Sequence, residues 1–274
     1  ILQYALNLKG KTFGELDKFN RLENKKNKGN LGHVIEESYF GYDINSDSNP
    51  DFSVAGIELK VTPFKINKNK TISAKERLVL NIIDYNEEYK HNFYDSSFWN
   101  KSKMMLLVFY EWKPEVKQED YIIKDVILYE FNEDDLAVIK NDWQIIIDKI
   151  KQGKAHEISE SDTSYLAACT KGQNKNSVRL QPFSEIPAKQ RAFSLKSGYM
   201  TQLLREHFNQ TDGNKVSLLN GSRKTIEQVL KEKFVPYYGM SIDEIANLLD
   251  VNIYTKDGKL TKNHAQILSS AILG

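Results

Sequence analysis

The sequence of 274 residues contains one cysteine, six prolines and no long hydrophobic run. A single thiol, Cys169, cannot form an internal disulfide bond, which favours a protein of the reducing cytoplasm. No apolar stretch approaches the roughly 20 residues that a membrane helix needs, so the pattern excludes a membrane-spanning protein. There is no signal peptide. Because the chain starts at Ile1 rather than at Met, we expect it to be part of a longer protein.

Two common kinds of site also lack their signatures. The five histidines are scattered and there is one cysteine, so no Cys/His cluster could hold zinc. Gly10-Lys11-Thr12 looks like the end of a phosphate-binding loop, but Ala5 occupies the position of the required first glycine. We therefore expect no use of ATP.

Aromatic residues are abundant, and the charge is unevenly spread. With 14 Tyr, 13 Phe and 3 Trp, the chain has far too many aromatic residues to be disordered. The net charge is only +1, yet residues 168–205 carry +6 and residues 111–135 carry −6. A basic segment with interleaved aromatic and amide side chains is typical of a surface that binds a polyanion such as nucleic acid. A solvated loop that happens to be basic is the alternative interpretation.

Hydrophobic periodicity predicts a mixed α/β (α+β) core with a mixed, mostly antiparallel sheet flanked by helices. Strands are expected at residues 56–63, 77–83, 104–112, 121–131 and 192–196. Helices are expected at residues 1–8, 33–40, 134–150 and 198–208. The second of these helices should end at Gly41.

A polar stretch at residues 209–222 reads as a linker. It divides a domain at residues 1–210 from a helical annex at 211–274, with helices expected at 225–234, 241–249 and 262–273. Ser241 and Glu244 form the capping-box pattern at the start of one of these helices.

The segment most informative about chemistry is residues 49–63, with the sequence NPDFSVAGIELKVTP. Glu58 and Lys60 are two apart in a predicted strand, so their side chains leave the same face. Asp51 lies seven residues before Glu58, in a turn. Carboxylate oxygens are ligands that Mg²⁺ prefers, and a neighbouring lysine can stabilise a phosphate and assist an attacking water. This P-D…(D/E)-x-K pattern is typical of many nucleases.

The spacing alone is weakly specific, because an acid two residues before a lysine occurs six times in the chain. Only Glu58–Lys60 lies within an apolar strand and follows a Pro-Asp pair. An amphipathic strand with an exposed ion pair is the alternative interpretation.

Several ordered motifs resemble the MutH/Sau3AI family of GATC-cleaving endonucleases. They are GNLGHVIEESYFG at 29–41, SNPDFSVAGIELKVTPFK at 48–65, SAKERLVLNIIDY at 73–85, YLAACTKG at 165–172 and AKQRAFSLKSGYMT at 188–201. The opening ILQYALNLKGKTFGEL resembles the N-terminal helix and turn of that family. The resemblance covers roughly residues 1–208, is stronger to the restriction branch than to the repair branch, and implies a restriction-endonuclease-like PD-(D/E)xK core.

The resemblance implies that Glu37, Asp51, Glu58 and Lys60 are the catalytic residues. Asp51 and Glu58 would hold Mg²⁺, and Glu37 would support a second metal ion or orient a metal-bound water. Glu37 is preferred to Glu36 because the family glutamate lies four positions before the glycine that ends the helix. The family has a further active-site lysine, for which Lys101 and Lys103 are both candidates.

The resemblance also implies a DNA-binding set in the basic segment. Its members would be Lys171, Lys175, Arg179, Lys189, Arg191, Ser194, Lys196 and Tyr199. The repair enzyme has a tyrosine implicated in sensing adenine methylation where this chain has Ser194. Cleavage of both strands irrespective of adenine methylation is the resulting expectation.

We therefore expect a type II restriction endonuclease that cuts both strands of double-stranded DNA at GATC with Mg²⁺. A second DNA copy could be bound by an effector domain that would follow residue 274. Three alternatives stay open: a MutH-type nicking endonuclease of mismatch repair, a non-catalytic GATC-binding module, and a hydrolase acting on something other than nucleic acid.

Overall fold

The computed structural model describes residues 1–24, 29–44, 49–172, 176–210, 233–255 and 257–273. The chain divides into two compact units, Ile1–Thr211 and Asp212–Gly274. The linker expected at 209–222 and the helix expected at 225–234 fall almost entirely outside the described ranges. Among the helices within those ranges, none is long and apolar enough to cross a membrane.

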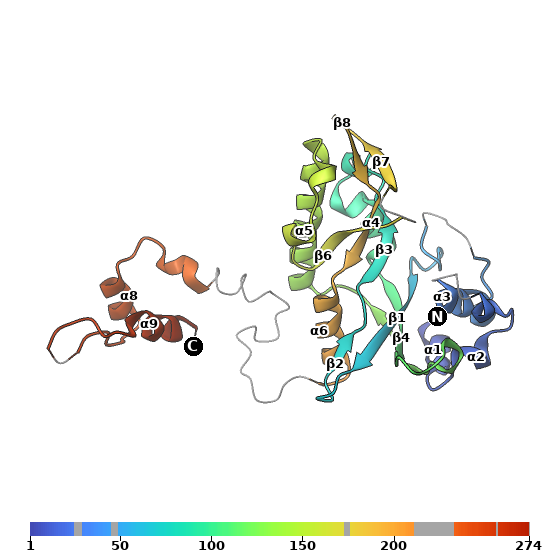
Figure 1. Ribbon diagram of the computed structural model, residues 1–274, viewed down its shortest axis with the longest axis horizontal. Helices are drawn as coiled ribbons and strands as arrows, with labels where there is room; N and C mark the ends of the chain where they lie inside the picture. The colour runs from blue at the N-terminus through green and yellow to red at the C-terminus, as the bar shows by residue number, and fades with distance from the viewer. Residues whose placement is uncertain (25–28, 45–48, 173–175, 211–232, 256, 274) are drawn as a thin grey trace. The chain divides into compact units, whose positions relative to one another are not determined.

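The larger unit is built around a mixed sheet of four strands in the order β2-β1-β4-β5 (Figure 1). Its strands are β1 (Glu58–Ile66), β2 (Ile72–Ala74), β4 (Met105–Glu111) and β5 (Ile123–Tyr129). Strands β1 and β4 run parallel, whereas the other two pairs are antiparallel. The predicted mixed, mostly antiparallel arrangement is confirmed.

The remaining strands form two separate antiparallel sheets. One has the order β3-β9-β6, and the other is the hairpin β7-β8. Their bounds are Leu78–Ile82 for β3, Leu166–Thr170 for β6, Val178–Gln181 for β7, Ser184–Lys189 for β8 and Arg191–Leu195 for β9. Strand patterns could not predict this division, because the sheet that a strand joins depends on distant partners.

Helices cover both sides of the central sheet (Figure 1). They are α1 (Leu2–Ala5), α2 (Phe13–Leu16), α3 (Asn30–His33), the π-helix η3 (Val34–Tyr39), α4 (Ser97–Ser102), α5 (Glu133–Lys151) and α6 (Ser197–His207). Short 3₁₀ turns connect them: η1 (Leu6–Leu8), η2 (Arg21–Glu23), η4 (Glu88–Lys90), η5 (Phe93–Asp95), η6 (Gln118–Asp120), η7 (Ala155–Glu157) and η8 (Glu160–Asp162).

Strand β4 is the centre of the core, because all seven of its side chains are buried. Successive side chains of a strand point to opposite faces. Met105, Leu107 and Phe109 accordingly pack in one hydrophobic cluster with α5. Leu106 and Val108 pack in a second cluster with the N-terminal helices. One strand therefore fixes the two helical layers on either side of the sheet.

Helix α5 confirms the helix predicted at residues 134–150 and is stabilised at both ends. The side chain of Asn132 caps its first turn by accepting a 2.8 Å hydrogen bond from the backbone N–H of Asp135. Acidic residues lie in the first turn and lysines in the last, which complements the helix dipole. Trp143 and Ile147 on the apolar face are fully buried.

The N-terminal region differs from the expected regular helices. The pattern at 1–8 forms the short helix α1 followed by the 3₁₀ turn η1. The predicted helix at 33–40 is mostly π-helix, although Gly41 ends it with the expected positive φ of 73°. The extra residue in a π turn changes which side chains share a face of the helix.

The smaller unit contains η9 (Val235–Tyr237), α8 (Ile242–Leu248) and α9 (His264–Leu273). The capping box of Ser241 and Glu244 is present at the start of α8. A small core of Ala246, Ile253 and Leu268 holds the described part of the unit together.

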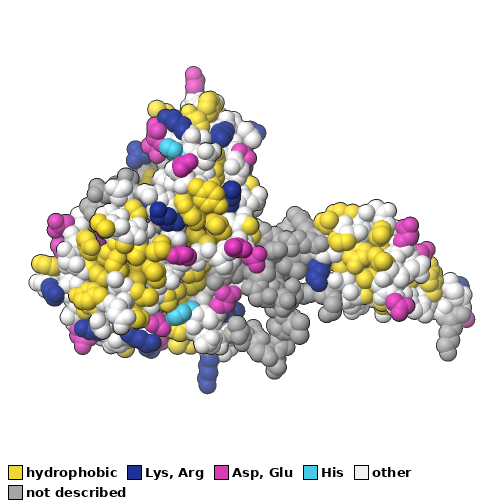
Figure 2. All heavy atoms as spheres, turned by 180° about the vertical axis from the view of Figure 1, so that it is seen from behind, with side chains coloured by type: hydrophobic (Ala, Val, Ile, Leu, Met, Phe, Trp, Pro, Cys, Tyr) yellow, Lys and Arg dark blue, Asp and Glu magenta, His cyan; other side chains and the backbone are white. Residues whose placement is uncertain are grey.

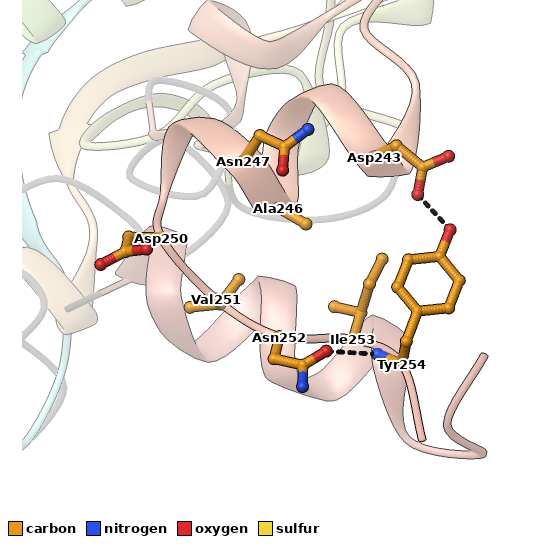
Figure 3. A pocket seen from close by; sticks show the side chains of 8 residues that line it. All are labelled: Asp243, Ala246, Asn247, Asp250, Val251, Asn252, Ile253 and Tyr254. Atoms are coloured by element: carbon orange, nitrogen blue, oxygen red, sulfur yellow. Dashed lines mark hydrogen bonds between the residues drawn. The ribbon is translucent and has the colours of Figure 1, made fainter. Parts of the chain in front are cut away.

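A hollow of about 490 Å³ lies beside α8 (Figure 3). Its rim is closed by hydrogen bonds from the Tyr254 hydroxyl to Asp243 and from the Tyr254 N–H to Asn252. These polar groups satisfy one another and define no reactive centre.

Candidate active site

The acidic site begins at a tight loop before β1. Phe52 and Ile57 pair through two backbone hydrogen bonds of 2.9 and 3.3 Å, and Gly56 adopts a positive φ of 67°. The loop folds Asp51 back along the strand, where its carboxylate accepts a 2.8 Å hydrogen bond from the N–H of Leu59. The Pro-Asp turn and the strand are thus joined in three dimensions.

Glu58 and Lys60 lie side by side on β1, as the period of a strand requires. The Lys60 ammonium donates a 2.7 Å hydrogen bond to Oε1 of Glu58. Glu58 is only 3% exposed, so this is not the exposed surface ion pair of the alternative interpretation. Its second oxygen, Oε2, is buried without a hydrogen-bond partner. A buried acceptor without a partner is costly and points to a cation that would complete the site.

The second lysine of the site is Lys101, at the end of α4. Its Nζ lies 3.7 Å from Oε2 of Glu58. Helix α4 leads directly into β4, and because β4 runs parallel to β1, Lys101 and Glu58 reach the same edge of the sheet. Lys103 is exposed and forms no ion pair with Glu58. The structure therefore favours Lys101 of the two candidates.

The π-helix contributes Glu36, not Glu37, to this cluster. Glu36 interacts electrostatically with Asp51, Glu58, Lys60 and Lys101. Burial, together with the like charge of Asp51, raises the pKa of Glu36 to about 7. The family spacing to Gly41 indicates Glu37, and only the tertiary structure shows that Glu36 is the glutamate close to Asp51 and Glu58.

Glu37 lies instead on the side of Arg21. Its carboxylate accepts two 2.7 Å hydrogen bonds from that guanidinium, one from Nε and one from Nη2. These bonds lower the pKa of Glu37. The predicted catalytic residue Glu37 is thus not among the carboxylates that this geometry brings together, since its oxygens are bound to Arg21.

The carboxylates of Glu36, Asp51 and Glu58 fit a divalent cation. All three supply oxygen ligands, and Oε2 of Glu58, which receives no hydrogen bond, is the buried acceptor that such an ion would satisfy. Burial, followed by the charge of Glu58, raises the pKa of Asp51. In the described part of the chain, no three acidic, histidine or cysteine side chains lie close enough to enclose an ion. Bound metal would have to draw these mutually repelling carboxylates together.

A hollow of about 850 Å³ opens beside Lys60. Three further cations line it, Lys75, Arg77 and Lys171, together with the acid Glu76, and Arg77 is ion-paired with Glu160. The ammonium of Lys75 lies 4.4 Å from the ring centre of Trp112, which also lines the hollow. Among the described residues, these cations place positive charge next to the acidic site. Lys75 and Arg77 were not predicted as site residues, although both lie in the motif SAKERLVLNIIDY at 73–85.

The predicted DNA-binding residues lie in different surroundings in the structure. Lys171 lines the hollow, and Arg179 and Lys189 are exposed on the hairpin β7-β8. Lys175 lies outside the described residues. On the face shown in Figure 2, basic and acidic side chains are interspersed over the larger unit rather than gathered in one basic field.

Two of the predicted DNA-binding residues, Arg191 and Ser194, are buried and bind within the protein. Arg191 donates hydrogen bonds to the carbonyls of Ala168 and Ile158, and Ser194 donates one to Ala167. Their side chains complete the junction of β9 with β6 and cannot reach DNA from these positions.

Tyr199 is also only 3% exposed, and its hydroxyl donates a 3.0 Å hydrogen bond to Asp135. Lys196 is half-buried, and its ammonium donates to the carbonyls of Glu160 and Thr163. Burial lowers the pKa of Lys196. Basic composition alone could not distinguish such internal roles from phosphate contacts.

A mixed sheet with helices on both sides, carrying Asp51, Glu58 and Lys60 at the edge of its central strands, defines the class: a restriction-endonuclease-like fold with an acid-acid-lysine site. The sequence model of the family described as DNA mismatch repair enzyme MutH matches residues 40–142, which include all three of these residues. The chain belongs to the MutH/Sau3AI family.

Named relatives come from both branches of this family. The type II restriction enzyme Sau3AI of Staphylococcus aureus is 47% identical over 233 residues, which are 83% of this chain and 47% of that enzyme. The DNA mismatch repair protein MutH of Vibrio vulnificus is 25% identical over 219 residues, 76% of this chain and 93% of that protein. MutH of Shewanella woodyi is 30% identical over 155 residues, 56% and 64% of the two chains. This chain therefore spans about half the length of the restriction enzyme.

Proposed function

We propose that this chain is the catalytic part of a type II restriction endonuclease that hydrolyses both strands of DNA at GATC with Mg²⁺. The observation that carries the proposal is the state of Glu58, which binds Lys60 through one oxygen and keeps the other buried and without a hydrogen-bond partner. The ion-pair partner of that second oxygen, the Lys101 ammonium, lies 3.7 Å away and donates it no hydrogen bond, so the oxygen can still serve a metal ion. Similarity to Sau3AI supports the restriction activity.

In this proposal the carboxylates of the site bind the metal ion and the lysines stabilise the phosphate. Asp51, Glu58 and Glu36 would hold the metal ion, with Glu36 taking the place first given to Glu37. Bound there, Mg²⁺ would supply positive charge beside the scissile phosphate. The Lys60 ammonium can stabilise the phosphate and orient an attacking water, and Lys101 adds a second positive charge on the other side of Glu58.

The hollow beside Lys60 supports double-stranded DNA as the substrate. Lys75, Arg77 and Lys171 in its walls can contact phosphates, and amide and aromatic groups stand among them. A hydrolase for a neutral substrate would not need this cation-lined surface. A cytoplasmic location is part of the proposal, because a single cysteine, Cys169, favours a reducing compartment.

The test is a cleavage assay with Mg²⁺ and a linear duplex that carries one GATC site. We expect double-strand cuts at GATC, and a loss of at least about 100-fold for Lys60→Ala. Lys90→Ala, which breaks an exposed ion pair with Glu87, should cut normally. Binding without cleavage by the unaltered protein would instead favour a GATC-binding module.

Methylated and two-site substrates refine the proposal. The sequence predicts cutting of fully adenine-methylated GATC. Ser194 is buried and so does not directly explain such tolerance, and the assay has to decide it. Faster cutting of a duplex with two GATC sites would support binding of a second DNA copy.

The second candidate is a nicking endonuclease of mismatch repair. It is favoured by the observation that this chain covers 93% of the Vibrio vulnificus MutH sequence. Single-strand nicks confined to hemimethylated GATC, in place of double-strand cuts, would establish this function.

A further inference from the structure

Two adjacent glutamates, Glu36 and Glu37, offer the active site a choice of carboxylate. The structure directs Glu36 toward Asp51 and Glu58, and Glu37 toward Arg21. Both residues belong to the π-helix η3, in which the N–H of Phe40 bonds the carbonyl of Ile35, five residues earlier, at 3.1 Å. An ordinary α-helical turn would omit one residue from this loop and rotate the two carboxylates relative to the sheet.

Arg21 is itself firmly placed. The carboxylate of Asp17 accepts hydrogen bonds of 2.9 Å from the backbone N–H groups of Arg21 and Leu22. The N–H of Lys18 donates a 3.2 Å hydrogen bond to the hydroxyl of Ser38, which is 3% exposed. Lys18 and Arg21 therefore hydrogen-bond to the π-helix at Ser38 and Glu37, the two residues that follow Glu36.

The contact between Arg21 and Glu37 is bidentate, which fixes direction as well as distance. Nε and Nη2 each lie 2.7 Å from a different oxygen of the carboxylate. A planar guanidinium on a carboxylate allows little rotation about the helix axis, whereas a single ammonium contact would allow more. The Glu37 side chain is 19% exposed, so this pair is better shielded than an ordinary surface ion pair.

We propose that Arg21 is a positioning residue that selects which of the two glutamates serves the metal site. By binding Glu37 it keeps that carboxylate from competing for the site, and so leaves Glu36 as the glutamate directed at Asp51 and Glu58. The inference rests on the proposed function, because the site that Glu36 serves is the proposed metal site.

The test measures Mn²⁺ binding to the whole chain by titration calorimetry without DNA. Arg21→Ala should weaken binding about 10- to 100-fold, the range found when a group that orients a metal ligand is removed. The double variant Arg21→Ala/Glu37→Gln should recover most of this loss, because the freed Glu37 can no longer compete with Glu36. Arg21→Lys should lie between Arg21→Ala and the unaltered protein. Lys90→Ala serves as the matched loss of a cation from an ion pair and should bind Mn²⁺ normally.

The rescue separates positioning from simple stabilisation. If Arg21 only stabilised the fold, removing Glu37 as well would not restore binding, and that outcome would overturn the inference. Unchanged binding by Arg21→Ala would overturn it equally, while leaving the proposed function intact. Absence of Mn²⁺ binding by the unaltered protein would contradict the proposed metal site itself. Urea unfolding of each variant shows that every comparison is made on folded protein.

Discussion

At the scale of single residues, the site brings three carboxylates together with the ammonium groups of two lysines. Glu58 is placed between Lys60 and Lys101, and one of its oxygens is buried without a hydrogen-bond partner. Glu36 and Asp51 bring further negative charge to the same place, and burial, followed by this like charge, raises the pKa of both. Such crowding is unfavourable in the metal-free protein and becomes favourable once a divalent cation is bound.

The raised pKa of Glu36 predicts that metal affinity depends on pH. Glu36 must lose its proton to bind a cation, so protons compete with metal below its pKa of about 7. We expect Mn²⁺ affinity to rise by up to about tenfold per pH unit as pH approaches 7 from below, and to level off above it. Glu36→Gln should bind more weakly and lose this dependence between pH 6 and 8. Calorimetry across that range measures both effects, and an unchanged pH profile in Glu36→Gln would contradict the assignment.

Lys101 and Lys103 offer a matched pair of substitutions. Lys101→Ala removes a cation 3.7 Å from the Glu58 carboxylate and should slow cleavage by about 100-fold or more. Lys103→Ala changes an exposed side chain two residues away and should leave the single-turnover cleavage rate within about twofold. Equal rates for the two variants would remove Lys101 from the active site.

At the scale of elements, register decides which residues can act. Parallel pairing of β1 with β4 brings the start of β1 and the end of α4 to one edge, and thus Glu58 to Lys101. The π turn of η3 decides which glutamate joins them. Helix α5 has a different task, because the carboxylate of Asp142 accepts backbone hydrogen bonds from Ser164, Tyr165 and Leu166 as β6 begins.

This junction between α5 and β6 predicts a large effect on stability. Asp142→Ala would leave three backbone N–H groups without their acceptor, each worth about 1 to 3 kcal/mol when buried. We expect the free energy of unfolding to fall by at least about 3 kcal/mol in urea titrations. Asp142→Asn, which keeps one acceptor oxygen, should lose less. If the two variants were equally stable, these hydrogen bonds would not be what holds β6 to α5.

At the scale of the whole molecule, most of the surface charge is balanced and the useful cations are local. The basic segment at 168–205 does not act as one positive surface, since Arg191 and Lys196 bind backbone carbonyls. Lys171 from this segment joins Lys75 and Arg77 beside the acidic site. DNA binding should therefore depend on a few cations around one hollow.

Salt dependence of DNA binding tests this distribution. Each lost phosphate contact reduces the slope of log K against log salt by about 0.9. The variant Lys75→Ala/Lys171→Ala should therefore lower the slope by roughly 1.8, measured by fluorescence anisotropy with Ca²⁺ in place of Mg²⁺. Lys9→Ala, which removes an exposed cation paired with Asp125, should leave the slope unchanged. An unaltered slope in the double variant would place the DNA elsewhere.

The sequence by itself determined the main elements and the core of the site. Apolar periodicity placed the central strands and α5 within a few residues, because burial on a sheet or helix face imposes a local repeat. The two-residue period of a strand predicted that Glu58 lies beside Lys60, and the Pro-Asp turn before the strand indicated Asp51.

Tertiary structure decided everything that depends on how distant segments meet. The choice of Glu36 over Glu37 depends on a π turn and on Arg21, which lies 16 residues away along the chain. The choice of Lys101 over Lys103 depends on the parallel pairing of two strands. The burial of Ser194 likewise depends on β6 and β3 lying on either side of β9. A local pattern fixes which residues share a face, but only long-range packing fixes what that face meets.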